Sequence, residues 1–421
     1  MKNMDYIDIH GYEKRLEWIQ KLAERYAISQ RNKNIIKKYD QTLAVIDRVG
    51  IARRVRVMEF LLLFARDYLK KDYQDATRDD MKRAIALVDA RKDYSVWTKQ
   101  GYRVIVKKFY RWLTYGDEYN APDKKLMYPE IVSWISCNIP RKDLPIVRPE
   151  NILTEVEIIK LLDAANSVRE EALIATLYED GCRIGEHGGV RLKHVMKDED
   201  CYIITVKGKT GSREVIIAKF ANLLTNWLNA HPYKNDPDAP LWVKKNTEEP
   251  LLYRGLCKVI KTIAKRAGIT KRIYPHIFRH SRATHGIVNE EFTQEGAKKL
   301  FGWTPDSKML ETYIHLTSKD VKDKYLEKLG LRKRENNGSI LDPKICPECK
   351  HPNLFNASIC ENCRALLDAN IGISMDKRIV AMKQLLEALC RDNYIQYRVS
   401  EMAKENSSLL EILKAVAGLS E

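Results

Sequence analysis

The sequence predicts a mainly α-helical fold with one small β-sheet, an α+β class, divided among several domains. Long stretches repeat apolar residues at intervals of three and four, which is the period of an amphipathic helix. One segment, residues 201–218, instead carries two runs of β-favouring residues around a glycine-containing turn. The length of 421 residues exceeds what a single hydrophobic core usually organises.

Residues 8–120 are expected to form a helical domain in which Gly50 is the one early glycine break. The clearest helix runs from Ser95 to Gly116. One of its faces is apolar at 3-4-3 spacing and predicts a buried surface, comprising Tyr102, Ile105, Phe109 and Trp112. The other side presents a cation at every fourth position, namely Lys99, Arg103, Lys107 and Arg111. This basic stripe is either an ordinary solvated face or a surface that contacts the phosphates of nucleic acid.

Residues 121–150 are expected to be an extended basic linker, because prolines recur there among arginine and lysine residues. A second domain, residues 151–335, follows the linker. Its first helix is predicted to begin after Thr154, since Thr154 and Glu157 have the spacing of a capping box. The β-hairpin at 201–218 lies inside this domain, and helices with short loops account for the rest of it.

The charge balance favours a polyanionic partner. Lysine and arginine number 73 against 57 acidic residues, for a formal net charge of +16. Nucleic acid is a commoner partner for such a chain than a membrane surface, although a generally basic protein shows the same excess. The N-terminal residues lack the apolar run of a signal peptide, and no stretch is apolar enough to span a bilayer. We therefore expect a cytoplasmic protein with no membrane partner.

Four cysteines near the C-terminus form two C-x-x-C pairs, comprising Cys346, Cys349, Cys360 and Cys363. In a chain without an export signal, this pattern favours a metal site over disulfides. Four thiolates complete a tetrahedral site and leave no open position, so we expect structural and not catalytic Zn²⁺. The pairs predict a zinc ribbon at residues 343–368. A helical tail at 375–418 follows, and it either packs on the body or contacts another subunit.

The segment from 181 to 315 gathers arginine, lysine, histidine and tyrosine residues without the acidic cluster that would hold Mg²⁺. Two arginines, Arg183 and Arg279, suit the non-bridging oxygens of a phosphodiester. A lysine and a histidine can transfer protons, and a tyrosine hydroxyl can attack phosphorus. This set predicts a DNA-cleaving site whose chemistry uses no metal.

Four segments of this region resemble the four sequence boxes of the tyrosine recombinases, in the family's order and at similar separations. They are GCRIGE (181–186), VKGKTGSREVII (206–217), PHIFRHSRATH (275–285) and LFGWTPDSKMLETYIHL (300–316). Residues 8–120 are similar to the family's helical core-binding (SAM-like) DNA-binding domain. The resemblance covers residues 20–330 and implies a tyrosine-recombinase catalytic domain at 151–335.

The resemblance implies a role for each matching residue. Arg183 and Arg279 would hold the scissile phosphate, and Lys209 would protonate the leaving 5′ oxygen. His276 would assist proton transfer. Glu186 and His280 are supporting residues, the first of them beside Arg183. Lys207 is an alternative to Lys209 as the working lysine.

Tyr313 would be the nucleophile, and Trp303 would donate a hydrogen bond to a phosphate oxygen. Two features depart from the family pattern. Tyr313 follows Trp303 by ten residues, one more than expected, and the doublet Gly188-Gly189 interrupts an expected helix. The residues alone give no physical reason for the doublet.

The resemblance implies a site-specific DNA recombinase or integrase that forms a 3′-phosphotyrosyl intermediate. Its partner would be double-stranded DNA, bound by a homotetramer on paired sites. Two other functions use the same scaffold: a type IB topoisomerase-like nicking-closing enzyme and a non-catalytic DNA-binding regulator. The complete set of site residues favours an active enzyme.

Overall fold

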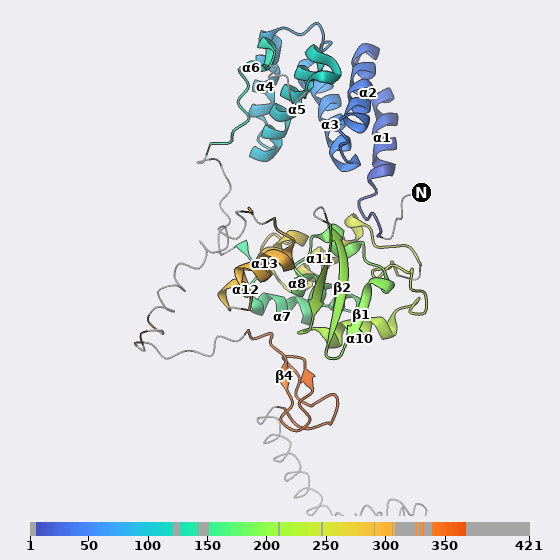
Figure 1. Cartoon of the computed structure of the whole chain (residues 1–421), viewed down its shortest axis with the longest axis vertical. Coiled ribbons are helices and arrows are strands. Elements are labelled where there is room, and N and C mark those ends of the chain that lie inside the picture. The colour runs from blue at the N-terminus through green and yellow to red at the C-terminus, as the bar shows by residue number, and fades with distance from the viewer. Residues whose placement is uncertain are drawn as a thin grey trace, which may run out of the picture.

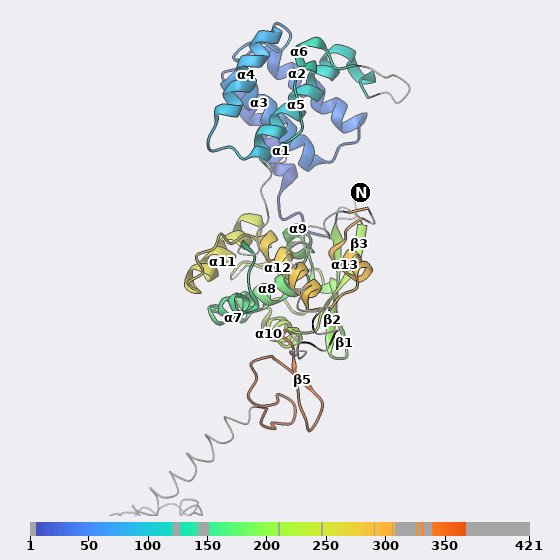
Figure 2. The ribbon, with the colours of Figure 1, turned by 90° about the vertical axis from the view of Figure 1, so that its left-hand side faces the viewer.

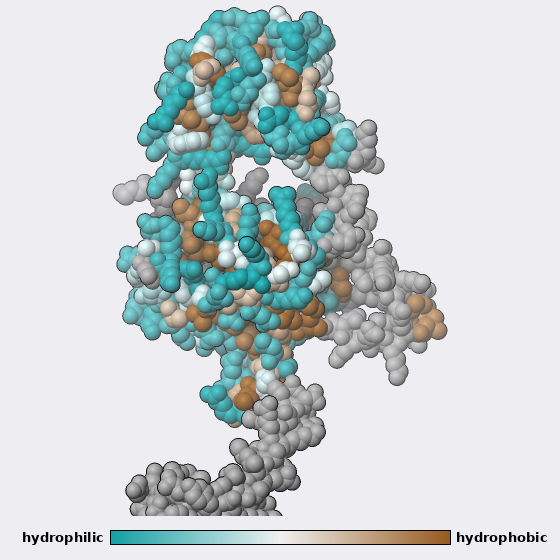
Figure 3. Space-filling model, turned by 180° about the vertical axis from the view of Figure 1, so that it is seen from behind, coloured by the Kyte–Doolittle hydropathy of each residue, from teal (hydrophilic) through white to brown (hydrophobic). Residues whose placement is uncertain are grey.

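The structure is a computed structural model. It describes residues 6–120, 127–140, 143, 151–208, 211–245, 247–289, 291–304, 306–307, 326, 329, 331 and 339–367. Helices α1–α6 form one body around their own hydrophobic core, and a small sheet with helices α7–α13 forms a second (Figures 1 and 2). Hydrophilic residues cover most of one face of the N-terminal body (Figure 3). Within the described ranges, no helix is both long and apolar enough to cross a membrane.

The N-terminal body is helical, as predicted. Its elements are α1 (Tyr12–Arg25), α2 (Gln30–Val45), α3 (Ile51–Leu63), the π-helical turn η1 (Phe64–Leu69), α4 (Arg78–Ala90), α5 (Val96–Tyr115), the 3-10 turn η2 (Gly116–Glu118) and α6 (Glu130–Ser133). Breaks at residues 26–29, 70–77 and 91–95 accompany the expected one at Gly50. Ser95 caps α5 by accepting a hydrogen bond from the Thr98 amide, and the predicted apolar face of this helix is buried.

The cations of the predicted basic stripe on α5 have partners within the N-terminal body, and their contact with DNA stays a prediction. Residues 128–137, which were expected to belong to the linker, pack against three of them, Arg103, Lys107 and Arg111. Lys107 Nζ donates to the Ile135 carbonyl oxygen at 2.7 Å, and Arg103 pairs with Asp89 at 2.5 Å. Lys99 donates to the carbonyl of Asp89, and Arg111 lies over the ring of Tyr128. All four side chains are half-buried, because they serve packing within this body.

The second body combines helices with a three-stranded antiparallel sheet of order β1-β2-β3. Its elements are α7 (Glu155–Asp163), α8 (Val168–Glu179), α9 (Ile184–Gly188), the 3-10 turn η5 (Leu192–His194), β1 (Val195–Asp198), β2 (Cys201–Gly208), β3 (Gly211–Ile217), α10 (Ala221–Ala230), α11 (Tyr253–Arg266), α12 (Pro275–Val288) and α13 (Gln294–Phe301). The predicted capping box is confirmed, since Thr154 and Glu157 exchange both hydrogen bonds at the start of α7. The predicted hairpin is also confirmed as β2 and β3.

Residues 6–10, here called the N-terminal strap, lie on the second body although they precede α1 in the sequence (Figure 1). Ile9 is only 2% exposed and belongs to the core of the second body. The Ile7 amide donates to the Gly189 carbonyl at 3.0 Å, and the Tyr253 amide donates to the Ile9 carbonyl at 2.9 Å. Residues 6–10 are therefore part of the second body's structure.

The strap gives the physical reason for the glycine doublet. A Cβ atom on Gly188 would lie 2.8 Å from Cδ1 of Ile9, and one on Gly189 would lie 2.8 Å from the carbonyl oxygen of Ile7. Both distances are shorter than real Cβ contacts allow. A side chain at position 189 would meet the backbone of the strap, so this position requires glycine, whereas one at 188 would meet the ends of the Ile9 and Leu256 side chains, which can shift.

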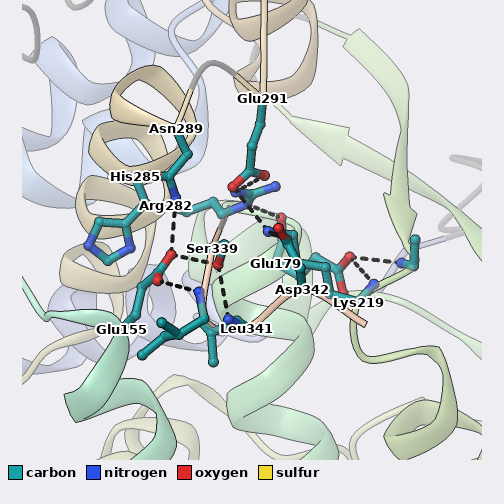
Figure 4. A network of polar contacts seen from close by, with 12 residues as sticks. Glu155, Glu179, Lys219, Arg282, His285, Asn289, Glu291, Ser339, Leu341 and Asp342 are labelled. Carbon is teal, nitrogen blue, oxygen red and sulfur yellow. Dashed lines mark hydrogen bonds and ion pairs between the residues drawn. The ribbon is translucent and has the colours of Figure 1, made fainter. Parts of the chain in front are cut away.

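A polar network fixes the segment that leads into the C-terminal ribbon (Figure 4). Glu155 accepts hydrogen bonds from Ser339 Oγ at 2.6 Å and from the amide of residue 340 at 3.1 Å. Lys219 pairs with Asp342 at 2.7 Å, and Leu341 between these contacts is fully buried. The ribbon therefore starts from a fixed point on the second body.

The ribbon itself contains the short strands β4 (Lys344–Ile345) and β5 (Pro352–Asn353), which pair antiparallel. It packs beside α10, where the rings of Phe355 and Phe220 lie 6.4 Å apart and Asn222 donates to Glu361 at 3.0 Å. The predicted tail at 375–418 lies outside the described residues.

Candidate active site and cysteine cluster

The first arginine box forms a tight turn followed by the short helix α9. Gly181 has a left-handed backbone (φ 54°), and a Cβ atom there would lie 2.3 Å from the ring of Phe301. Arg183 occupies the N-cap of α9, and its side chain is 36% exposed. Its Nη1 donates to Glu186 Oε1 at 2.8 Å, and its amide donates to Oε2 of the same carboxylate at 3.0 Å. In this geometry Glu186 orients Arg183.

Glu186 is buried and has a second cationic partner, Arg213, whose Nη2 donates to Oε2 at 2.8 Å. Burial raises the pKa of the Glu186 carboxyl, but the hydrogen bonds and charges of Arg213 and Arg183 outweigh burial and hold that pKa below its usual value. Glu186 is therefore ionised at neutral pH, and together with its two arginines it carries one net positive charge.

Helix α12 brings the second arginine to the same place. Arg279 is buried, and its guanidinium donates to the Gly181 carbonyl at 2.9 Å and to the Phe301 carbonyl at 2.5 Å. Because Gly181 lies two residues before Arg183, the first of these bonds sets the two arginine boxes side by side. The second ties both to the end of α13.

Crowding of positive charge lowers the proton affinity of the groups on α12. Burial, and then repulsion from Arg183, lowers the pKa of Arg279 to about 10, so this side chain stays protonated at neutral pH. The pKa of His276 is lowered because surrounding protein shields the ring from water and because Arg279 and Arg183 are close. Burial and the neighbouring His276 lower the pKa of His280 to about 4. Both imidazoles are therefore neutral at pH 7 and can accept a proton.

Trp303 follows α13, which ends at Gly302 in a left-handed backbone (φ 58°). The indole is buried, stacks on Phe301 with ring centroids 4.9 Å apart, and lies 5.7 Å from the guanidinium carbon of Arg279. Trp303 is thus placed beside the second arginine, where its N–H can act as a donor but not as a base.

The structure leaves two of the predicted residues unplaced. Lys209 and Tyr313 both lie outside the described residues. Strands β2 and β3 extend to Gly208 and Gly211, so Lys209 belongs to the two-residue connection between them. Lys207 is exposed near the end of β2. A Cβ atom on Gly208 would lie 2.2 Å from Glu186 Oε1, so the end of the hairpin lies directly against the carboxylate that holds Arg183.

Six predicted residues do come together from α9, α12 and the turn after α13, namely Arg183, Glu186, His276, Arg279, His280 and Trp303. Sequence reasoning missed Arg213. A signal for it was present, because alternation along the predicted strand puts Arg213 on the same face as the buried Val215 and Ile217. An arginine on the buried face of a strand needs a partner, and that partner is Glu186.

The cysteine cluster forms a second candidate site. Among the described residues, the four cysteines are the one group whose donor atoms fit a metal ion, with all four Sγ atoms within 4.8 Å of one another. The nearest Sγ pairs are 3.5 and 3.6 Å apart, too long for disulfides. Tetrahedral zinc with Zn–S bonds of ~2.3 Å places sulfurs ~3.8 Å apart. The donor set therefore fits a zinc ion.

Comparison with known proteins agrees with this geometry. Residues 151–320 match the phage integrase family. The tyrosine recombinase XerD of Bifidobacterium longum is 27% identical over 193 residues, which are 42% of this chain and 61% of that protein. The region 151–320 of this chain is therefore similar to the phage integrase family and to the tyrosine recombinases. Transposase A from transposon Tn554 of Staphylococcus aureus is 25% identical over 193 residues, which are 42% of this chain and 52% of the transposase.

The likeness extends to three-dimensional structure. A solved XerH site-specific recombinase, bound to its palindromic difH substrate, has a TM-score of 0.51 and 20% identity. The match covers 75% of this chain and 96% of the XerH chain. The two proteins share a fold. The sequence matches span 61% and 52% of the two curated relatives, so activity, substrates and partners of the whole protein belong to the proposal below.

Proposed function

We propose that this protein is a tyrosine recombinase, a site-specific DNA recombinase or integrase that cuts and rejoins strands through a 3′-phosphotyrosyl intermediate. The observation that carries the proposal is the bond from Arg279 to the Gly181 carbonyl, which brings Arg279 next to Arg183. Glu186 compensates part of this charge, and the remaining cations suit a DNA phosphodiester.

In the proposed cleavage, Arg183 and Arg279 hold the non-bridging oxygens of the scissile phosphate. The Tyr313 hydroxyl attacks phosphorus, and the bond from phosphorus to the 5′ oxygen breaks as the new bond forms. Neutral His276 accepts the phenolic proton, and Lys209 donates a proton to the leaving 5′ oxygen. Rejoining is the reverse reaction with a different 5′ hydroxyl. The protein side chains supply every proton transfer in this scheme.

Trp303 and His280 have supporting roles in the proposal. The indole N–H of Trp303 would donate to a phosphate oxygen beside Arg279. His280 is neutral at pH 7, so it would add no further positive charge to the cations around Arg279.

The proposed partner is double-stranded DNA, with affinity supplied mainly by phosphate contacts. Exchange between two duplexes requires two cuts in each duplex, so we infer a homotetramer on paired sites. In this proposal the four cysteines of the ribbon, residues 343–368, hold structural Zn²⁺. The zinc would stabilise the ribbon and take no part in cleavage.

The test is a suicide substrate, a nicked duplex whose cleavage releases a short fragment and traps the enzyme on DNA. The duplex is designed from sequences that flank the gene and resemble attachment sites. Purified full-length protein in EDTA should give an adduct that survives denaturation. Tyr313→Phe should bind the same DNA and give no adduct. An adduct that persists in Tyr313→Phe would refute the nucleophile assignment.

The same material separates the two alternative functions. Relaxation of supercoiled plasmid without recombinant product would identify a nicking-closing enzyme. Tight, salt-sensitive binding without any adduct, on every candidate site supplied, would identify a DNA-binding regulator.

A further inference from the structure

Arg213 joins three parts of the site with one guanidinium group. The residue lies on β3, in the hairpin whose turn contains Lys209. Its Nη2 donates to Glu186 Oε2 at 2.8 Å, and its Nε donates to the Leu300 carbonyl at 2.9 Å. We propose that Arg213 is a positioning residue for DNA cleavage, an inference that rests on the function proposed above. It sets the hairpin, the carboxylate that orients Arg183, and the end of α13 at fixed separations.

The surroundings of Arg213 are built to fit this side chain. It is 12% exposed, and Nη1 is buried with no hydrogen-bond partner among the described residues. Cβ atoms on Gly208 and Gly302 would lie 3.4 and 3.0 Å from Nη1. Glycine on both sides therefore makes room for a planar guanidinium between the hairpin and the turn before Trp303.

The end of α13 receives two arginines at consecutive carbonyl groups. Leu300 O accepts from Arg213, and Phe301 O accepts from Arg279. The last carbonyls of a helix lack intrahelical partners and carry the negative end of its dipole, so cations stabilise them. Trp303 follows this turn directly. Its place beside Arg279 consequently depends on Arg213 as well.

Removing Arg213 would also change the ionisation of Glu186. Burial raises the pKa of the Glu186 carboxyl, and Arg213 is the largest opposing influence. Without Arg213 that pKa rises, so Glu186 takes up a proton as the pH falls through a range where the wild-type carboxylate is ionised. Protonated Glu186 holds Arg183 less firmly. A cleavage defect from this cause therefore grows as the pH is lowered.

The experiment compares Arg213→Met, Arg213→Lys and the wild-type chain by the rate of adduct formation on saturating suicide substrate between pH 5.5 and 8.5. Arg169→Met is the matched control, since Arg169 is a half-buried arginine of the same body that donates to a carbonyl, Val243 O at 2.8 Å, away from the site. Arg213→Met should cleave about 10- to 100-fold more slowly at pH 8, the effect expected for hydrogen bonds to charged groups, and slower still at pH 6. Arg213→Lys should recover part of the rate.

Three results would overturn the proposal. One is a wild-type rate and pH profile in Arg213→Met. Another is an equal loss in Arg169→Met, which would indicate general destabilisation. The third is weakened DNA binding with an unchanged rate for bound DNA. Absence of an adduct with the wild-type chain would instead refute the proposed function.

A measurement on the DNA-free protein tests the positioning role without any activity. Hydrogen exchange in Arg213→Met, and in Arg213→Lys if the first variant folds poorly, should increase in residues 201–217 and 298–303. Exchange in α8 and α10 should stay as in Arg169→Met. Unchanged exchange in both segments would overturn the proposal whatever the enzyme does.

Discussion

Replacing Ile9 with alanine should release the N-terminal strap from the second body. Ile9 is 2% exposed in a packed core, and truncation of such a residue costs ~2–5 kcal/mol. The strap is a short segment that two backbone hydrogen bonds and Ile9 hold on the second body, so it can detach while the second body stays folded. A loss of ~3 kcal/mol then appears as local opening, with about 100-fold faster exchange of the amides that the strap protects.

Those amides belong to Ile7 and Tyr253, which form the two backbone hydrogen bonds between strap and body. Hydrogen exchange of both should be measured in Ile9→Ala. The control is Ile46→Ala, because Ile46 is 48% exposed in the N-terminal body and its truncation should leave both amides unchanged. If exchange of both amides in Ile9→Ala stays within about 3-fold of wild type, the strap contributes no such stability and the reasoning fails.

The glycine doublet provides a second readout of the same contact. In Gly188→Ala the new methyl meets Cδ1 of Ile9 at 2.8 Å and Cδ1 of Leu256 at 2.7 Å. Ile9→Ala removes the first obstacle. Gly188→Ala should therefore cost less in the Ile9→Ala background than in the wild type, a coupling that a double-mutant cycle measures. Strict additivity would mean that the two side chains do not share this space.

Three further predictions concern other parts of the chain. Lys107→Ala should lower the free energy of unfolding by ~1–2 kcal/mol, because Lys107 Nζ donates a hydrogen bond to the Ile135 carbonyl. The same change should leave the salt dependence of DNA binding unchanged. A slope of log K against log salt that is smaller by about one would favour the phosphate-contact interpretation. Cys346→Ser should lose bound zinc by elemental analysis while adduct formation persists; retained zinc would contradict the four-thiolate site. His280 has a pKa of about 4 in the folded protein, against 6.5 in a model peptide. The unfolded chain therefore binds a proton at His280 more readily than the folded protein does. For this reason the free energy of unfolding should fall by ~2–3 kcal/mol as the pH is lowered from 7 to 4.5. Denaturant titrations of wild type and His280→Gln at both pH values check this, and equal losses in the two proteins would count against it.

Patterns confined to a short stretch of sequence were predictable. The α5 helix, the capping box at Thr154 and the hairpin of β2 and β3 each depend on residues within a few positions of one another. The convergence of Arg183 and Arg279 was accessible only through the family resemblance, since nothing local brings α9 and α12 together.

The sequence did not reveal contacts between distant segments. It gave no sign that residues 128–137 fold back over Lys107 and Arg111. The glycine doublet had no local reason because its reason is a strap at the start of the chain. Arg213 was overlooked because its buried partner, Glu186, belongs to another box.

Gly11 is the single residue between the strap and α1. Its φ is 62°, and a Cβ atom there would meet nothing within 4 Å. His10 on one side packs 4.8 Å from the ring of Tyr253, and Tyr12 on the other begins α1. A single residue thus separates the contacts of the strap with the second body from the first turn of α1. The φ and ψ angles of Gly11 alone therefore set the direction in which α1 leaves the strap.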